Sequence, residues 1–220
     1  MLDDVRARIA SAAARTGRTP SDVRLVAVTK GVDVARIEAA IAADVTDIGE
    51  NRVQEAATKH DRVRAAATWH LIGHLQTNKA ARASAIFDVV HSVDSERVAR
   101  ALALHRPADR DPLAVLIEVE LTGQPSRAGV REDDAETLVR SLLGLPGIHL
   151  VGLMTIAPQV TDPEQARPAF VRLRQLRDRV EQASGWPLPE LSMGMSEDFE
   201  VAVEEGATMV RIGRAIFAPD

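Results

Sequence analysis

The feature of this sequence that most constrains its fold is a regular alternation between two kinds of segment. Short apolar runs rich in β-branched residues alternate with segments whose apolar residues recur at helical spacing, such as Val34, Ile37 and Ile41. This alternation is typical of βα units around a parallel sheet. The apolar runs are eight in number: Arg24 to Lys30, Val45 to Gly49, Trp69 to Gly73, Phe87 to Ser92, Leu113 to Leu121, His149 to Ile156, Glu190 to Met195 and Thr208 to Ile212.

Eight strands with helices between them predict an α/β fold, a single (β/α)8 TIM-type barrel that takes up the whole chain, residues 1–220. The barrel is expected over about residues 23–218, preceded by an extra N-terminal helix over about 3–17. That helix is expected to fill the outer ring where a helix after the eighth strand is missing. The connection from Pro158 to Trp186 is expected to be one long helix that begins at Asp162-Pro163 and ends near Gly185. A doubly wound sheet is the alternative.

Composition narrows the classes of function. The 27 Lys and Arg against 32 Asp and Glu give a formal net charge of −5, which disfavours a general nucleic-acid binder. No cysteine is present, so a disulfide framework and a thiolate metal site are excluded. No apolar run is long enough to span a membrane, and the first residues lack an apolar signal core. We therefore expect a soluble, cytoplasmic protein and, in the absence of an oligomerisation motif, a monomer.

In such a barrel, functional groups gather at the C-terminal ends of the strands. Lys30 ends the first run on the same face as Val26 and Val28. A desolvated lysine there would lose its proton more easily and become a nucleophile for aldehydes, whereas a solvated strand-end lysine is the alternative. Arg211 shares a face with Met209 in the last run, so it either points into the barrel as a fixed cation or outward toward a helix.

Two further groups near strand ends have alternative interpretations. Ser196 is a candidate N-cap, and with Gly213 it would form a phosphate-binding cup, or else a plain helix cap. His70 and His74 have a spacing that suits a metal only on a helix, and here they flank a strand end. We therefore expect structural or loop histidines and no metal site.

Several motifs together resemble those of one family. These are LVAVTK, DIGENRVQEA, WHLIGHLQTNKA, LVGLMTIAP and LSMGMSEDFEVAVEEGATMVRIGRAIFA. The chain resembles the pyridoxal-phosphate homeostasis family, also called the proline synthetase co-transcribed homologue family, from about Leu25 to Ala218. The resemblance implies a barrel like the N-terminal domain of bacterial alanine racemase that binds pyridoxal 5′-phosphate (PLP) as a Schiff base.

The resemblance also implies roles for particular residues. Lys30 in LVAVTK is the Schiff-base lysine, and Asn51 in GENRVQEA lies beside the cofactor. Ser196 and Gly213 bind the phosphate, and Arg211 faces the pyridine nitrogen. The remaining residues that the resemblance places in the cofactor site are Met154, Met195 and Arg214.

Three positions depart from the family pattern. Arg214 stands where the family often has Thr or Ser, Ala218 where Gly is frequent, and Arg127 where Lys is common. Arg214 either reaches the phosphate as a charge clamp or turns outward and leaves only its backbone N–H.

The resemblance favours a binding protein over an enzyme, because the groups that racemisation needs are missing. Barrel racemases take their second base from a tyrosine of another domain, and this chain has no tyrosine. An arginine at the ring nitrogen also keeps that nitrogen unprotonated, which weakens the cofactor as an electron sink. We expect a protein that buffers PLP and delivers it to PLP-dependent apoenzymes, with no catalytic residues. The alternatives are a weak PLP-dependent racemase-like enzyme and a cofactor-free Schiff-base aldolase.

Overall fold

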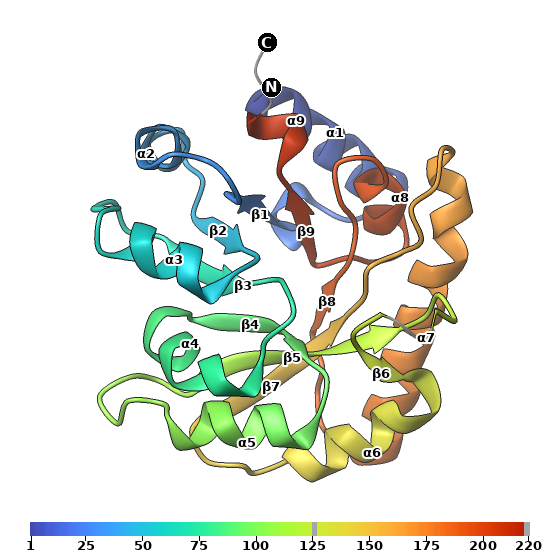
Figure 1. The fold of residues 1–220 in the computed structure, drawn as a ribbon. Coiled ribbons are helices and arrows are strands. Elements are labelled where there is room, and N and C mark those ends of the chain that lie inside the picture. The colour runs from blue at the N-terminus through green and yellow to red at the C-terminus, as the bar shows by residue number, and fades with distance from the viewer. Residues whose placement is uncertain (125–126, 218–220) are drawn as a thin grey trace.

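The computed structural model describes residues 1–124 and 127–217, and within them eight parallel strands close into a ring. The strands follow one another around the barrel in chain order, and β4 pairs with β5 to complete the circle. β1 (Arg24–Val28) has β2 (Asp47–Glu50) on one side and β9 (Met209–Ile212) on the other. The predicted barrel is therefore confirmed, and an open, doubly wound sheet is excluded (Figure 1).

The remaining ring strands are β3 (Thr68–Leu71), β4 (Val89–Val93), β5 (Leu113–Glu120), β7 (Ile148–Met154) and β8 (Glu190–Ser192). All eight fall on the predicted apolar runs, but most are shorter. The first run, for example, was expected to continue to Lys30, whereas Thr29 to Gly31 form the turn that follows β1. A two-residue strand, β6 (Val130–Arg131), pairs with the end of β5 outside the ring and was not expected.

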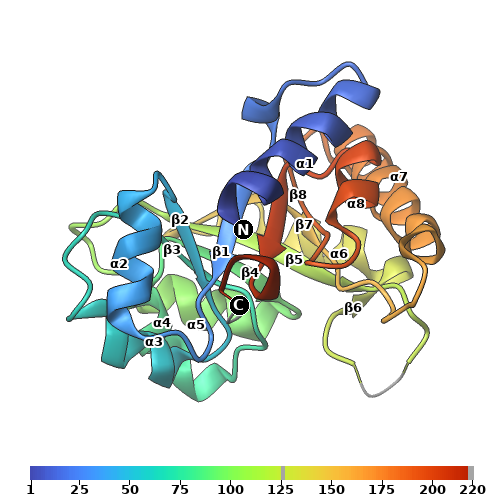
Figure 2. The ribbon, with the colours of Figure 1, turned by 90° about the horizontal axis from the view of Figure 1, so that it is seen from above.

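Helices surround the barrel, as Figures 1 and 2 show. They are α1 (Leu2–Arg15), α2 (Val34–Ala42), α3 (Val53–His60), α4 (Ala80–Ile86), α5 (Glu96–Leu104), α6 (Glu132–Leu142), α7 (Arg167–Ser184), α8 (Phe199–Glu204) and α9 (Arg214–Phe217). Short 3₁₀ turns lie at Pro20–Asp22, Thr77–Lys79 and Pro163–Ala166. Among the described residues, no helix is both long and apolar enough to cross a lipid bilayer.

The N-terminal helix takes the place expected of it. α1 packs against α8 and α9, where the ring would otherwise have only the four residues of α9 after the last strand (Figure 2). Val5, Ile9 and Ala12 of α1 are buried because they recur at helical spacing on one face. Arg18 ties this region to the barrel by donating to the carbonyl oxygens of Val203 and Ala207.

The long connection also matches its prediction. The Asp162 carboxylate accepts from the N–H of Glu164 and begins a 3₁₀ turn, which continues into α7. α7 ends at Gly185, whose φ of 68° is the left-handed conformation that glycine adopts without steric cost.

The buried apolar residues form two clusters. The larger one lies between the strands and the surrounding helices and includes Ile48, Leu71 and Val210. The smaller one, of Val89, Leu116 and Met154, comes from the opposite face of the strands and fills the interior of the barrel. The interior also holds several buried polar side chains, and these define the site.

Candidate functional site

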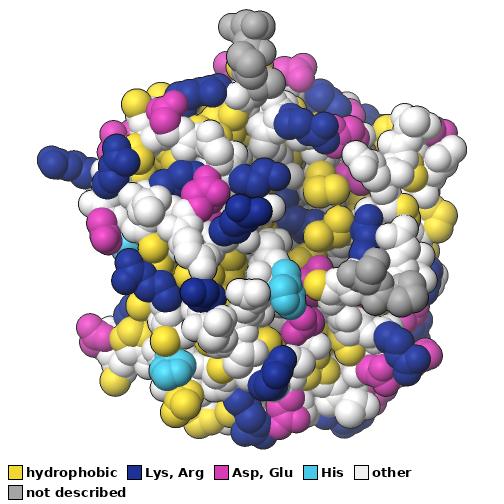
Figure 3. All heavy atoms as spheres, viewed as in Figure 1, with side chains coloured by type: hydrophobic (Ala, Val, Ile, Leu, Met, Phe, Trp, Pro, Cys, Tyr) yellow, Lys and Arg dark blue, Asp and Glu magenta, His cyan; other side chains and the backbone are white. Residues whose placement is uncertain are grey.

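A cavity of about 640 Å³ lies at the C-terminal ends of the strands. Its walls come mainly from residues at or after the ends of β1, β2, β3, β7, β8 and β9. This is the edge at which a barrel of this kind carries its functional groups. Figure 3 shows Lys and Arg side chains gathered near the middle of this face. Seven of the eight predicted site residues line this cavity: Lys30, Asn51, Met195, Ser196, Arg211, Gly213 and Arg214.

The eighth predicted residue lies deeper. Met154 is fully buried in the interior cluster with Val89 and Leu116 and is not among the residues that line the cavity. Ile156, which packs against that cluster, lines the cavity instead. Met154 and Ile156 differ in position because β7 ends at Met154. The residues that follow the strand therefore reach the rim of the cavity, and Met154 does not.

Lys30 is exposed at the rim of the cavity, which agrees with the alternative of a solvated lysine and not with that of a desolvated one. Thr29, just before it, is fully buried, and the turn after Thr29 carries Lys30 out of the strand. The buried lysine of this region is Lys59 of α3, which the sequence analysis did not identify.

The backbone on both sides of Lys30 is held by α3. Lys59 Nζ donates to the Thr29 carbonyl oxygen at 2.7 Å, and the N–H of Gly31 donates to Glu55 Oε1 at 2.7 Å. Lys59 also donates to Glu55 and to the fully buried Glu50, each at 2.7 Å. Burial raises the pKa of Glu50, against the opposing effect of Lys59 and the Thr29 hydroxyl. This network holds the backbone on both sides of Lys30, and none of its hydrogen bonds uses the Lys30 amine.

Ser196 lies opposite, in the loop between β8 and α8. The prediction that it is the N-cap of α8 is wrong: α8 begins at Phe199 with Asp198 as N-cap, and Asp198 Oδ1 accepts from the N–H of Met195 at 2.6 Å. The Ser196 hydroxyl instead accepts weakly, at 3.5 Å, from the N–H of Ala215 at the start of α9. It is therefore available for a ligand, and it lies where two chain segments meet.

Gly213 is required by the packing of neighbouring strands. A Cβ at this position would lie 3.2 Å from Val28 Cβ and 3.3 Å from the Val28 carbonyl oxygen. Any side chain would therefore press on the end of β1, two residues before Lys30. Glycine keeps the first and last strands in contact and leaves the backbone at their junction open to the cavity.

Arg211 points into the barrel, which decides between the two orientations that the sequence allowed. Its side chain is buried; one guanidinium nitrogen donates to Ser192 Oγ at 2.5 Å and the other to the Thr155 carbonyl oxygen at 2.9 Å. Burial lowers the pKa of Arg211 to about 10, against the attraction of Asp198 and Glu118. The group thus remains a cation at neutral pH.

Further cations surround the cavity. Arg214 is exposed and forms an ion pair with Glu197, and both line the cavity, so its guanidinium neither enters the barrel nor turns away from the rim. Arg36 of α2 also lines the cavity and donates to the Phe217 carbonyl oxygen at 2.6 Å. Arg127 donates to the carbonyl oxygen of Ile156 at 3.2 Å. Ala218 lies outside the described residues.

The two histidines that were considered as metal ligands lie in different environments. His70 is fully buried inside the barrel, and His74 is exposed in the loop after β3, 3.3 Å from Asp94. Within residues 1–124 and 127–217, no group of three or more His, Cys, Asp or Glu side chains is arranged to hold a metal ion. The expectation of structural and loop histidines agrees with these positions.

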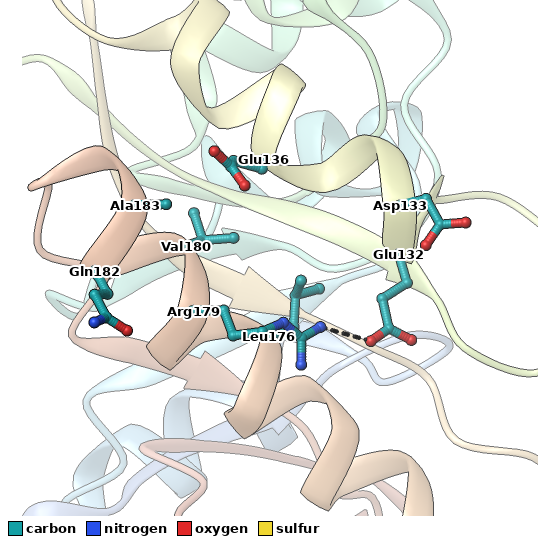
Figure 4. Close-up of a pocket in the computed structure, with 8 residues that line it drawn as sticks. All are labelled: Glu132, Asp133, Glu136, Leu176, Arg179, Val180, Gln182 and Ala183. Atoms are coloured by element: carbon teal, nitrogen blue, oxygen red, sulfur yellow. Dashed lines mark hydrogen bonds and ion pairs between the residues drawn. The ribbon is translucent and has the colours of Figure 1, made fainter.

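A second cavity lies on the outside of the barrel, between α6 and α7 (Figure 4). Glu132, Asp133 and Glu136 line it on α6, and Arg179 of α7 donates to Glu132 at 2.9 Å. It shares no lining residue with the cavity that contains Lys30 and Arg211, and no lysine lines it. The chemistry therefore lies in the cavity at the strand ends.

That cavity combines a free primary amine, a hydroxyl and several arginines. An amine condenses with an aldehyde to form an imine and release water, and arginines with a hydroxyl suit a phosphate ester. The set of donors fits a small anion that carries both a carbonyl and a phosphate group.

Comparison with known proteins defines the class first. Residues 1–219 match the family model described as alanine racemase, N-terminal domain. The fold agrees: alanine racemase from Corynebacterium glutamicum is similar with a TM-score of 0.67 at 19% identity, over 100% of this chain and 62% of that one.

Relatives with higher sequence identity define the family within this class. A pyridoxal phosphate homeostasis protein of Aquifex aeolicus is 39% identical over 98% of this chain and 95% of its own length, and one of Escherichia coli K12 is 38% identical over 98% and 94%. PipY of Synechococcus elongatus PCC7942, whose structure has been solved with PLP bound, is 36% identical with a TM-score of 0.85, over 97% of this chain and 100% of that one. The chain belongs to the pyridoxal phosphate homeostasis protein family.

Proposed function

We propose that this protein binds PLP in the cavity at the strand ends and serves to store it and deliver it to PLP-dependent apoenzymes. The observation that carries the proposal is the meeting of the Lys30 amine, the Ser196 hydroxyl and the Arg211 cation around one cavity. The relatives support it, because one is a structure with PLP bound and others are named for PLP homeostasis. The proposal includes a cytoplasmic location and a monomeric state.

In this proposal each residue has a separate task. Lys30 would supply the amine, which can condense with an aldehyde and release one water molecule. Ser196 and the open backbone at Gly213 receive the phosphate, with Arg214 near it on the rim. Arg211 would face the pyridine nitrogen as a hydrogen-bond donor. Asn51 and Met195 line the cavity, and Met154 lies deeper, in the interior cluster.

The test of the binding site is simple because the chain has three lysines, Lys30, Lys59 and Lys79. Protein incubated with PLP and reduced with borohydride should gain one pyridoxyl group, located at Lys30 by peptide mass mapping. Lys30→Ala should abolish both the label and the visible absorption band while the circular dichroism spectrum stays unchanged. Lys79→Ala, which alters a lysine outside the cavity, is the matched control. A label on Lys59 or Lys79 in the parent would overturn the assignment to Lys30.

The proposal also assigns the chain no catalytic cycle. Arg211 remains charged, so a ring nitrogen beside it cannot hold a proton of its own, and a carbanion at Cα of a bound amino acid gains little stabilisation. Exchange of the Cα proton of alanine in heavy water should be slow in the parent and faster in Arg211→Glu, with both proteins confirmed to carry PLP. Rapid exchange in the parent together with an inactive variant would favour the alternative of a weak racemase-like enzyme.

A further inference from the structure

A chain of hydrogen-bonded polar side chains crosses the interior of the barrel beneath the cavity. Arg211 of β9 contacts Ser192 Oγ of β8 at 2.5 Å, and Ser192 Oγ lies 2.8 Å from His91 Nδ1 of β4. His91 Nε2 lies 2.8 Å from His70 Nδ1 of β3, and His70 Nε2 lies 2.8 Å from Asp47 Oδ1 of β2. Every member is buried, and the cofactor-binding role proposed above uses none of them except Arg211.

The two ends of this chain fix its direction. A guanidinium only donates hydrogen bonds, so Ser192 must accept from Arg211. At the other end, burial favours the neutral carboxyl, but hydrogen bonds from His70 and Thr46 hold the pKa of Asp47 below its ordinary value, so an ionised carboxylate accepts there. Between them His91 is uncharged, because full burial lowers its pKa well below the usual 6.5 and the positive charges of Arg211 and Arg24 act in the same direction.

Only one arrangement of protons gives every donor in this chain of side chains an acceptor. His70 Nε2–H donates to Asp47, which leaves its Nδ1 as an acceptor for His91 Nε2–H. His91 Nδ1 is then an acceptor for the Ser192 hydroxyl, which itself accepts from Arg211. In the opposite arrangement, His91 Nδ1–H would donate to Ser192 and His70 would have to carry protons on both nitrogens. That arrangement adds a positive charge inside the barrel and leaves the Ser192 proton without an acceptor among residues 1–124 and 127–217.

We infer that Ser192, His91, His70 and Asp47 form a one-way hydrogen-bond relay that positions Arg211 and links this buried cation to a carboxylate on the far side of the barrel interior. Among the described residues, no carboxylate lies within ion-pair distance of Arg211, so the relay and the Thr155 carbonyl are what fix its guanidinium. These are positioning residues. Their effect on PLP rests on the proposed function, since Arg211 is the donor that the relay would hold against the ring.

The proton arrangement is tested on the chain without cofactor, so that this test does not depend on PLP binding. Two-bond ¹H–¹⁵N correlation spectra of protein labelled at histidine distinguish a protonated from an unprotonated ring nitrogen. We expect both His70 and His91 to carry their proton on Nε2. A proton on Nδ1 of His91 would overturn the relay, whatever the protein binds.

The positioning role is tested with Ser192→Ala, which removes the link between Arg211 and His91. Ser84→Ala is the matched control, because Ser84 is also fully buried but donates to the Leu102 carbonyl outside the barrel. Ser192→Ala should release the fixed proton pattern of His91 and weaken PLP binding about two- to tenfold, the range of one hydrogen bond. Ser84→Ala should change neither, although both variants lower the melting temperature.

Asp47→Asn tests the far end of the relay, since it removes the charged acceptor at a position outside the cavity lining. We expect the ring-nitrogen signals of both His70 and His91 to shift and PLP binding to weaken in the same direction as in Ser192→Ala. Histidine spectra that change only at His70, with PLP affinity at the parent value, would show an isolated Asp47–His70 pair and overturn the relay. Failure of the parent itself to bind PLP would overturn the proposed function but not the proton arrangement.

Discussion

The residue whose role is most open to a simple test is Ser196. Its hydroxyl forms one weak contact in the protein, at 3.5 Å from the N–H of Ala215. If it donates to a phosphate, Ser196→Ala should weaken PLP binding by roughly 0.5 to 1.5 kcal/mol, with inorganic phosphate competing at the same place. Fluorescence or absorbance titration of PLP measures this change.

Ser95→Ala is the matched control for that substitution. Ser95 is the N-cap of α5, and its hydroxyl accepts from the N–H of Val98 at the same distance of 3.5 Å, outside the cavity. It should lower the melting temperature about as much as Ser196→Ala and leave PLP affinity unchanged. Equal affinities in the parent and in Ser196→Ala would remove Ser196 from the phosphate site.

At the residue scale, the residues that line the cavity could be predicted from the sequence better than the residues that hold them in place. Lys30, Ser196 and Arg211 stand at strand ends, where a barrel pattern directs attention. The supporting contacts have no such signal, because their partners are distant in sequence: His91 and Ser192 are 101 residues apart. Lys59 had no signal in the sequence either, since a lysine near the end of a helix is ordinarily solvated.

At the scale of the element, the C-terminal end of α7 allows the free-energy cost of a left-handed backbone conformation to be measured. Gly185 ends the helix at a φ of 68°, and a Cβ there would meet no atom within 4 Å. Gly185→Ala should therefore lower the free energy of unfolding by about 1 kcal/mol through the left-handed conformation alone. Gly185→Asn should cost less, because asparagine tolerates that conformation better. Chemical denaturation of the three proteins gives the comparison, and equal losses for both variants would point to a cause other than backbone conformation.

The sequence predicted which helices and strands exist better than it predicted where each one begins and ends. The helical start at Asp162-Pro163 and the end at Gly185 were visible because capping residues act locally. The end of β1 was placed two residues too late, since Thr29 and Lys30 continue the alternation of the strand while the chain has already turned. The start of α8 was misplaced at Ser196, because Asp198 competes for the same role and its carboxylate closes the preceding turn.

At the scale of the whole molecule, the buried polar interior gives stability a defined pH dependence. His91 stays neutral in the folded chain well below 6.5, whereas in the unfolded chain it takes up a proton near that pH. The unfolded state therefore binds more protons, and the free energy of unfolding falls as pH drops from 6.5 toward the folded-state pKa. The slope from this single group is on the order of 1 kcal/mol per pH unit.

Urea denaturation between pH 7 and pH 5 measures that slope, and His91→Gln should reduce it. Burial raises the pKa of Glu50, Glu118 and Asp198, so their protonation opposes the effect of His91, and the difference between parent and variant isolates the histidine. Ser84→Ala, a change at a buried side chain that does not titrate between pH 7 and pH 5, is the control and should keep the parent slope. A parent and a His91→Gln variant with identical slopes would contradict this account.

The closure of the barrel also has a consequence for the order of events during protein synthesis. β1, near the beginning of the chain, pairs with β9, near its end, so one edge of the first strand has no neighbour until almost all residues have been made. At about 5 to 20 residues per second, a ribosome needs roughly ten seconds or more to bridge that interval. Lys30 follows β1 and Arg211 belongs to β9, so a nascent chain carries the reactive amine long before it has the cation that completes the cavity. The cavity with both Lys30 and Arg211 in its wall therefore exists only after β9 has been made.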